Sequence, residues 1–140
     1  MNQNDELIAQ AKNLLVLYVE DEENTRELTS QILKLFFGKV ITAINGLEAL
    51  NIYKKEEVDL VMTDLTMPVM DGLEMIKEIK NIKQEQHVIV LTAHNSNENL
   101  METIDLQLDG FLLKPIKMDK MLELLYKVSR TINLEKMENS

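Results

Sequence analysis

Short apolar runs alternate along the chain with longer segments in which apolar residues recur at helical spacing. Continuous apolar runs of this length are typical of strands buried on both faces of a sheet, and spacings of three and four are typical of amphipathic helices. The predicted strands span residues 14–19, 40–44, 58–64, 87–93 and 110–115. A helix is predicted after each strand.

Two patterns place the predicted helices. In the first helix the apolar stripe consists of Leu28, Ile32, Leu35 and Phe36, and the later helices cover residues 47–53, 75–82, 100–108 and about 118–132. A residue that can cap a helix stands three positions before a glutamate in the pairs Asn24–Glu27, Asn45–Glu48, Asp71–Glu74 and Asn95–Glu98. This spacing is typical of a capping box, in which each side chain bonds the other residue's free backbone N–H.

Regular alternation of strands and helices predicts an α/β fold, a (βα)5 doubly wound parallel sheet. For five such units the flavodoxin-like strand order 2-1-3-4-5 is the most common, and ligands bind beyond the carboxyl ends of the strands. We expect one domain at residues 14–132. Residues 1–13 are expected to be a frayed lead-in or a short extra helix, and residues 133–140 an extension of the last helix or a tail.

Composition narrows the classes of function. The chain has 15 basic and 24 acidic residues and a net charge of −9, which disfavours direct nucleic-acid binding and favours cations and basic partners. Its apolar runs are too short to cross a bilayer, its N-terminus does not resemble a signal peptide, and it has no cysteine. We therefore expect a cytoplasmic protein without membrane insertion.

Reactive side chains stand at the ends of four predicted strands. Glu20 and Asp21 follow the first strand, Asp64 ends the third, and Thr92 and Lys114 lie at the ends of the fourth and fifth. We expect them to converge, because the carboxyl ends of parallel strands share one edge of the sheet. Close carboxylates repel one another by roughly 4 kcal/mol per pair at intermediate dielectric. Lys114 and a bound Mg²⁺, which suits a few carboxylates with water and phosphate oxygens, would neutralise them.

These residues could carry out phosphoryl transfer. Ionised Asp64 is a nucleophile that needs no base, and its attack on a phosphoryl donor would leave an acyl phosphate. The protein's main task in such a reaction is to position groups and to neutralise charge on the equatorial oxygens. Mg²⁺, Lys114 and the Thr92 hydroxyl could do so.

The chain resembles the receiver domains of bacterial two-component response regulators over residues 14–132. The resemblance rests on Val19-Glu20-Asp21, on residues 64–72 (Asp-Leu-Thr-Met-Pro-Val-Met-Asp-Gly), on Leu91-Thr92-Ala93 and on residues 111–115 (Phe-Leu-Leu-Lys-Pro). It implies that Asp64 accepts a phosphoryl group from the phosphohistidine of a sensor histidine kinase or phosphotransfer protein. Such a protein is not an enzyme for other substrates, because it catalyses only its own phosphorylation and dephosphorylation.

The resemblance also implies roles for the surrounding residues. Glu20, Asp21, Asp64 and the backbone carbonyl of Thr66 would arrange Mg²⁺, some of them through water. Thr92 and Lys114 would bind the phosphoryl group, and the Lys114–Pro115 peptide would be cis. Glu20 stands where the family more often has aspartate.

A switch is implied as well. Thr92 would move toward the phosphoryl group, and Phe111, at a position where tyrosine is common, would turn inward. The face made by helix 100–108, strand 110–115 and the last helix would then act on a downstream protein or on an output domain that this sequence lacks. The sequence leaves open a homodimer through that face, and either a stand-alone regulator or a piece of a longer one.

Three alternatives differ in the residues they require. A flavodoxin-like cofactor binder needs a Ser/Thr/Gly loop after the first strand to hold phosphate, but residues 20–23 are Glu-Asp-Glu-Glu. A haloacid-dehalogenase-type phosphatase needs a second acid two residues after its nucleophile, and position 66 is Thr. A pseudo-receiver that is never phosphorylated and serves as an interaction module is the remaining alternative.

Overall fold

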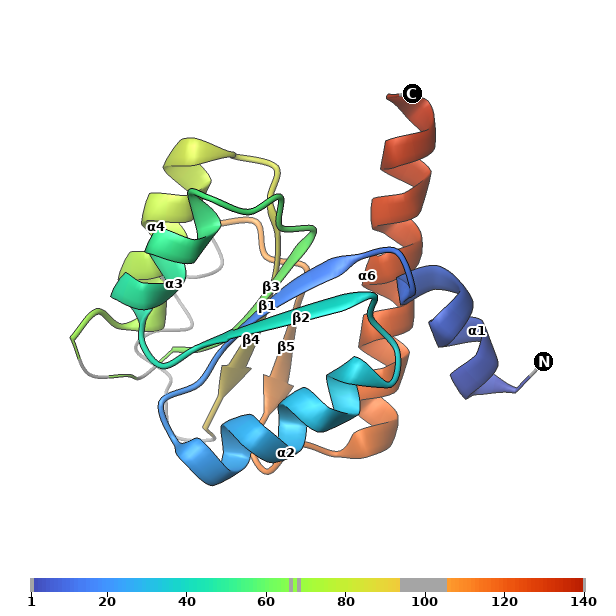
Figure 1. The fold of residues 1–140 in the computed structure, drawn as a ribbon, viewed down its shortest axis with the longest axis horizontal. Coiled ribbons are helices and arrows are strands. Elements are labelled where there is room, and N and C mark those ends of the chain that lie inside the picture. The colour runs from blue at the N-terminus through green and yellow to red at the C-terminus, as the bar shows by residue number, and fades with distance from the viewer. Residues whose placement is uncertain (1, 66, 68, 94–105, 140) are drawn as a thin grey trace.

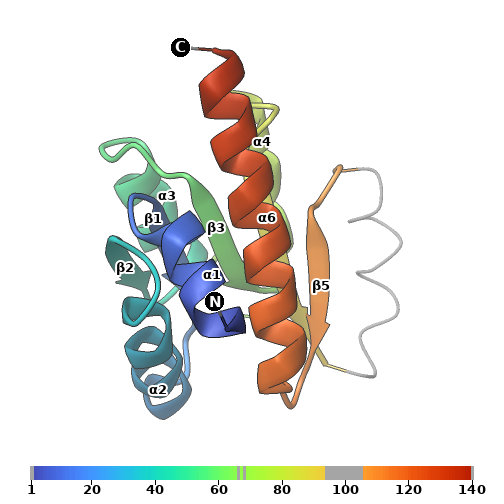
Figure 2. The same ribbon diagram turned by 90° about the vertical axis from the view of Figure 1, so that its right-hand side faces the viewer.

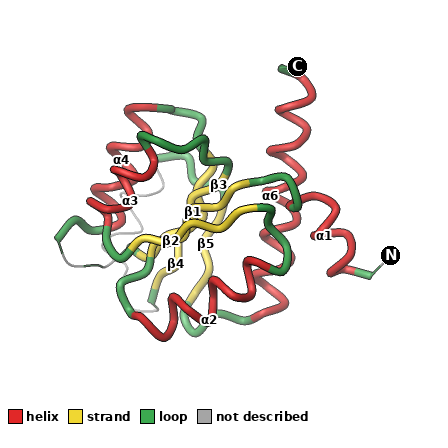
Figure 3. The backbone as a smooth tube through the Cα atoms, in the orientation of Figure 1, coloured by secondary structure: helices red, strands yellow, loops and turns green. Residues whose placement is uncertain are grey.

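A computed structural model describes residues 2–65, 67, 69–93 and 106–139 of the chain. Its five strands form one sheet in the order β2-β1-β3-β4-β5, and each neighbouring pair is parallel (Figures 1 and 3). The strands are β1 (Leu15–Val19), β2 (Lys39–Ala43), β3 (Leu60–Asp64), β4 (His87–Thr92) and β5 (Gly110–Leu113). The predicted fold class and strand order are therefore confirmed.

Helices cover both faces of this sheet. They are α1 (Gln3–Ala11), α2 (Glu23–Lys34), α3 (Gly46–Tyr53), α4 (Gly72–Ile82) and α6 (Met118–Glu138). Helices α3 and α4 lie over one face, and α1, α2 and α6 over the other (Figure 1). Of the helix predicted at residues 100–108, residues 106–108 are loop and the rest lie outside the described residues.

Strand β1 shows how the two faces make two apolar cores. Val16 and Tyr18 pack into the cluster beneath α1, α2 and α6, whereas Leu17 and Val19 pack into the cluster beneath α3 and α4. Successive side chains of a strand point to opposite faces, so a strand covered on both sides must be apolar at every position. The charged side chains near β1 and β3 thereby stand at the strand ends or just beyond them.

The predicted apolar stripe of α2 is confirmed in part: Phe36 is buried and Ile32 packs against the same core, but Leu28 and Leu35 face solvent. Leu28 and Leu35 are 64% and 68% exposed, whereas Thr29, Ser30 and Leu33 are buried. Ser30 can face the core because its hydroxyl donates to the Glu27 carbonyl, at 3.0 Å, within the same helix. Thr29 and Ser30 thus lie on the buried side of α2, at positions that the pattern of apolar residues does not identify.

Two of the predicted helix caps are confirmed and one is wrong. The side chains of Asn45 and Asp71 each accept from the backbone N–H three residues later, at 2.8 Å. Helix α2 begins earlier than predicted. Its N-cap is Glu22, whose side chain accepts from the N–H of Thr25, and Asn24 lies inside the helix. The fourth pair, Asn95–Glu98, lies outside the described residues.

The two ends of the chain pack against each other on one face of the sheet. Residues 3–11 form helix α1 beside α6, which continues to Glu138 (Figure 2). Leu7 and Ala11 are buried in the same cluster as Ile132. The Asn133 amide donates to the carbonyl and side-chain oxygens of Gln10 at 2.7 and 2.9 Å. Of the alternatives for residues 1–13, the structure therefore shows the extra helix.

No helix in the described part of the chain combines the length and apolar character needed to span a membrane.

The burial of α1 makes a prediction about stability. Leu7 is fully buried and Ile8, its neighbour on the same helix, is 38% exposed. Leu7→Ala should lower the free energy of unfolding by about 2–5 kcal/mol because it leaves a cavity, whereas Ile8→Ala should cost less than about 1 kcal/mol. Urea denaturation of both variants measures the difference. Equal, small effects would show that α1 does not dock.

Candidate functional site

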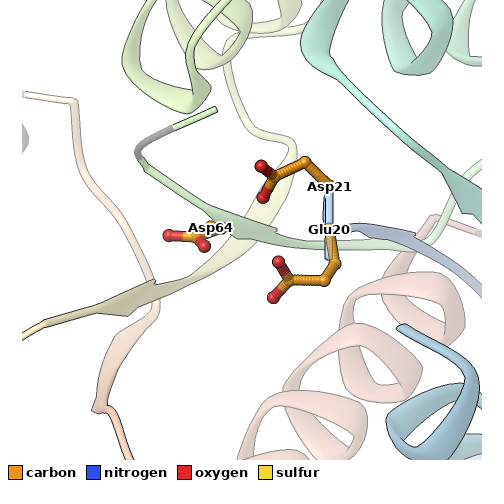
Figure 4. A group of neighbouring side chains, drawn as sticks. All are labelled: Glu20, Asp21 and Asp64. Carbon is orange, nitrogen blue, oxygen red and sulfur yellow. The ribbon is translucent and has the colours of Figure 1, made fainter. Parts of the chain in front are cut away.

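Three carboxylates meet at the carboxyl edge of the sheet (Figure 4). Glu20 and Asp21 follow β1, and Asp64 is the last residue of β3. Strands β1 and β3 are neighbours, so their ends meet although the residues lie far apart in sequence. One oxygen of each carboxylate lies within 4.8 Å of the others. The structure thus brings together the three acids that the sequence places at strand ends.

An ammonium group lies against two of these carboxylates. The Lys114 Nζ is 2.6 Å from Asp64 Oδ2 and 3.1 Å from Glu20 Oε1. Burial by itself would lower the pKa of Lys114, but the hydrogen bonds and charges of Asp64 and Glu20 outweigh it and raise that pKa. Lys114 is therefore held as a cation between the carboxylates.

Glu20 is the most deeply buried of the three acids, at 1% exposure. Burial raises the pKa of its carboxyl group, and the N–H of Glu22 and the charge of Lys114 offset this only in part. Asp21, in contrast, is exposed. The cluster thus has a buried side, which Lys114 neutralises, and a solvent side where another cation could approach.

Arg26 fixes the turn that carries two of the acids, a role that the sequence did not reveal. From the first turn of α2 its Nη1 donates to the backbone carbonyls of Glu20, at 2.9 Å, and Asp21, at 3.3 Å. An arginine shortly after an acidic turn was the available signal. Its partners are backbone atoms, however, and side-chain patterns do not show them.

The loop after Asp64 folds back tightly upon itself. Gly72 donates its N–H to the Leu65 carbonyl at 2.7 Å, and a Cβ at Gly72 would overlap the backbone oxygen of Asp64. Val69, at the exposed tip, has a φ of 73°, which is unusual for a β-branched residue. Asp71 caps α4 and is engaged there rather than among the carboxylates.

Thr92 and Phe111 lie on the neighbouring strands β4 and β5. Thr92 is buried, and its hydroxyl donates to the Ala93 carbonyl at 3.3 Å. Phe111 is 38% exposed and lines a cavity of about 530 Å³ together with Leu113 and Lys117. The Lys114–Pro115 peptide is cis. The structure therefore shows the aromatic side chain partly exposed and the threonine hydroxyl bonded to the backbone carbonyl of the next residue.

Residues 16–126 match the response regulator receiver domain family. This chain belongs to that family. Receiver domains act in two-component systems, where they interact with histidine kinases or phosphotransfer proteins and with downstream targets. Most of the chain, including every strand and the three acids, lies within the matched residues or next to them.

Known receiver proteins resemble this chain in sequence and structure. It is 37% identical over 102 residues to the chemotaxis protein CheY of Halobacterium salinarum, covering 73% of this chain and 85% of that protein. It is 33% identical over 108 residues to sporulation initiation phosphotransferase F of Bacillus subtilis, covering 77% and 87%. A response regulator receiver domain protein from Clostridium thermocellum superposes with a TM-score of 0.78 at 27% identity, covering 89% and 98%.

The acids of this receiver domain fit Mg²⁺. Receiver domains generally bind this ion in an acidic pocket, and Glu20, Asp21 and Asp64 supply hard oxygen donors from one small region. The exposed carboxylate of Asp21 leaves room for water ligands, which Mg²⁺ tends to keep. The Thr66 carbonyl, the fourth predicted ligand, lies outside the described residues.

The buried charge of Glu20 leads to a prediction about Mg²⁺. Two close opposite charges attract each other by roughly 4 kcal/mol at intermediate dielectric, and about a third of that energy corresponds to a tenfold change in affinity. Glu20→Gln removes one such charge and should therefore weaken Mg²⁺ binding by about tenfold or more. Because burial opposes ionisation of Glu20, the metal-free variant should be no less stable than the wild type. Thermal unfolding with and without Mg²⁺ measures both effects.

Glu23→Gln is the matched control, because it removes an exposed charge from the first turn of α2 outside the carboxylate cluster. A Mg²⁺-dependent rise in melting temperature that is the same in Glu20→Gln as in this control would contradict the assignment of Glu20.

Proposed function

We propose that this receiver domain is a phosphoacceptor whose Asp64 takes a phosphoryl group from the phosphohistidine of a sensor histidine kinase or phosphotransfer protein. The single observation that carries the proposal is the position of Asp64, in contact with Lys114 and within reach of Glu20 and Asp21. In this proposal the protein works in the cytoplasm and catalyses only its own phosphorylation and dephosphorylation.

Each residue of the site has a distinct part in the proposed transfer. An oxygen of Asp64 attacks the phosphorus of the donor, the phosphorus–nitrogen bond breaks, and its electron pair stays on the donor imidazole. Lys114, already bonded to Oδ2 at 2.6 Å, holds the carboxylate in place and then faces the phosphoryl oxygens. Mg²⁺, held by Glu20, Asp21 and Asp64, would supply positive charge opposite those oxygens.

Thr92 and Phe111 would turn the modification into a change of surface. A phosphoryl group adds charge and strong hydrogen-bond acceptors, which the Thr92 hydroxyl can reach by leaving its weak 3.3 Å bond to Ala93. The space that Thr92 leaves would allow Phe111 to turn inward. The repacked face includes β5 and α6 and is the proposed contact for a downstream protein, an output domain or a second copy.

The competing proposal is a pseudo-receiver that binds a partner without being phosphorylated. It requires the same fold but not a reactive Asp64. Phosphorylation by a small donor separates the two proposals, because acetyl phosphate needs no partner surface.

Incubation with acetyl phosphate and Mg²⁺ should give one phosphate adduct in the intact mass of the wild-type protein. Asp64→Asn should abolish it because the nucleophilic oxygen is lost. Asp71→Asn is the matched control: Asn is also a good helix cap, so α4 and the adduct should both persist. The pseudo-receiver is favoured if the wild type forms no adduct, and a different acceptor is indicated if Asp64→Asn still forms one.

The proposed switch predicts a change that reaches beyond the site. Beryllofluoride with Mg²⁺ mimics an aspartyl phosphate, so it should shift the NMR signals of Thr92, Phe111 and Leu113 as well as those around Asp64. Thr92→Val should abolish the shifts at Phe111 because valine lacks the hydroxyl. Shifts confined to Asp64 and its immediate neighbours in the wild type would contradict the switch.

A further inference from the structure

A histidine lies between two carboxylates at the edge of the sheet opposite the acidic cluster. His87 Nδ1 is 2.7 Å from Asp109 Oδ1, and its Nε2 is 2.6 Å from Glu135 Oε1. His87 is the first residue of β4, Asp109 directly precedes β5, and Glu135 lies near the end of α6. One side chain therefore connects three elements that are far apart in sequence.

The geometry of these contacts favours a charged imidazole. A neutral imidazole has one N–H and can donate to only one carboxylate, so its other nitrogen would present a lone pair to the second. Both nitrogens of His87 lie at hydrogen-bond distance from carboxylate oxygens, so when both carboxylates are ionised the two contacts are hydrogen bonds only if both nitrogens carry protons. The hydrogen bond to Asp109 contributes most to raising the pKa of His87, burial opposes it, and Glu135 adds to it.

Two of the surrounding cations, Lys80 and Lys136, have partners of their own. The other charged groups near His87 are Lys80 of α4, Lys83 and Glu85 of the following turn, Asp59 before β3 and Lys136 of α6. Lys136 pairs with Asp59 at 2.8 Å. Lys80 donates to the carbonyls of Gln84, Gln86 and Gln107 at 3.2, 2.7 and 3.2 Å. Asp109 and Glu135 thus remain the direct partners of His87.

We propose that His87 is a proton-dependent fastener that holds the end of α6 against β4, whereas Asp109 is also held there by hydrogen bonds with the backbone of Val88. Residues 133–138 of α6 lie beyond the part of the chain that matches the receiver family. Two other side-chain contacts are described for this extension, Asn133 with Gln10 and Lys136 with Asp59. Neither contact contains a group whose ordinary pKa lies near neutrality. Among the contacts described for this extension, the His87–Glu135 contact is the one that the loss of a proton from His87 can release.

The direction of the pH effect follows from the charge of the bonded form. His87 gains partners as a cation on folding, so its contribution to stability is complete below the ordinary histidine pKa of about 6.5. It is lost as the pH rises through the raised pKa of the folded state. The end of α6 is therefore fastened in mildly acidic solution and loosened in alkaline solution.

NMR titration of the imidazole tests the proposal directly. The chain has two histidines, and a His94→Gln variant identifies the signal of His87. The pKa of His87 should lie above about 6.5 in the wild type and fall toward that value in Glu135→Gln, which keeps the shape of the side chain but removes its charge. A wild-type value at or below 6.5, or a value unchanged in Glu135→Gln, would overturn the proposal.

Urea denaturation at about pH 5.5 and about pH 8.5 gives an independent test. His87→Gln should increase the unfolding constant more at the acidic pH, by up to about tenfold for each unit by which folding raises the pKa. Lys136→Gln, which removes a neighbouring ion pair of the same extension, should have the same effect at both pH values. An effect of His87→Gln that does not depend on pH would refute the fastener, whether or not Asp64 is phosphorylated.

Discussion

The contact of one ammonium group with two buried carboxylates is the interaction on which the site depends. The sheet is covered on both faces, so ionised side chains can approach one another only where the strands end. Glu20 and Asp64 do so at the ends of β1 and β3, in an environment where an unpaired charge is strongly unfavourable. Lys114 makes their proximity tolerable and leaves the third acid, Asp21, facing solvent.

The same arrangement would prepare the site for the proposed phosphoryl transfer. The carboxylate of Asp64 is held by a short bond to Lys114, and Arg26 holds the turn of Glu20 and Asp21 through backbone carbonyls. These groups are already in position, so the proposed transfer would need little reorganisation of the site. Gly72 approaches the backbone oxygen of Asp64 so closely that a larger residue would overlap it, and this contact helps to fix the backbone of the proposed nucleophile.

The sequence predicted the parts of this structure that repeat locally. Strands covered on both sides read as apolar runs, and Asn45 and Asp71 mark helix starts by their spacing. Regular alternation of strands and helices predicts a parallel sheet with β1 beside β3. Because Glu20 and Asp64 stand at the carboxyl ends of these two strands, the sequence predicted that they lie close together. The burial of Thr29 and Ser30 in α2 was missed because a pattern of apolar residues does not identify polar residues in core positions. The partners of Arg26 and His87 were missed because such contacts follow no local period.

Helix α1 also determines from which side a partner can approach α6. It lies along one flank of α6, on the side toward α2, and shares a buried apolar contact with it (Figure 2). A partner helix of the usual diameter cannot use that flank without first displacing α1. The opposite flank, beside β5, is free of α1 (Figure 2). The additional helix thus leaves the β5 side of α6 as the side on which α1 would not obstruct a partner of this receiver domain (Figure 2).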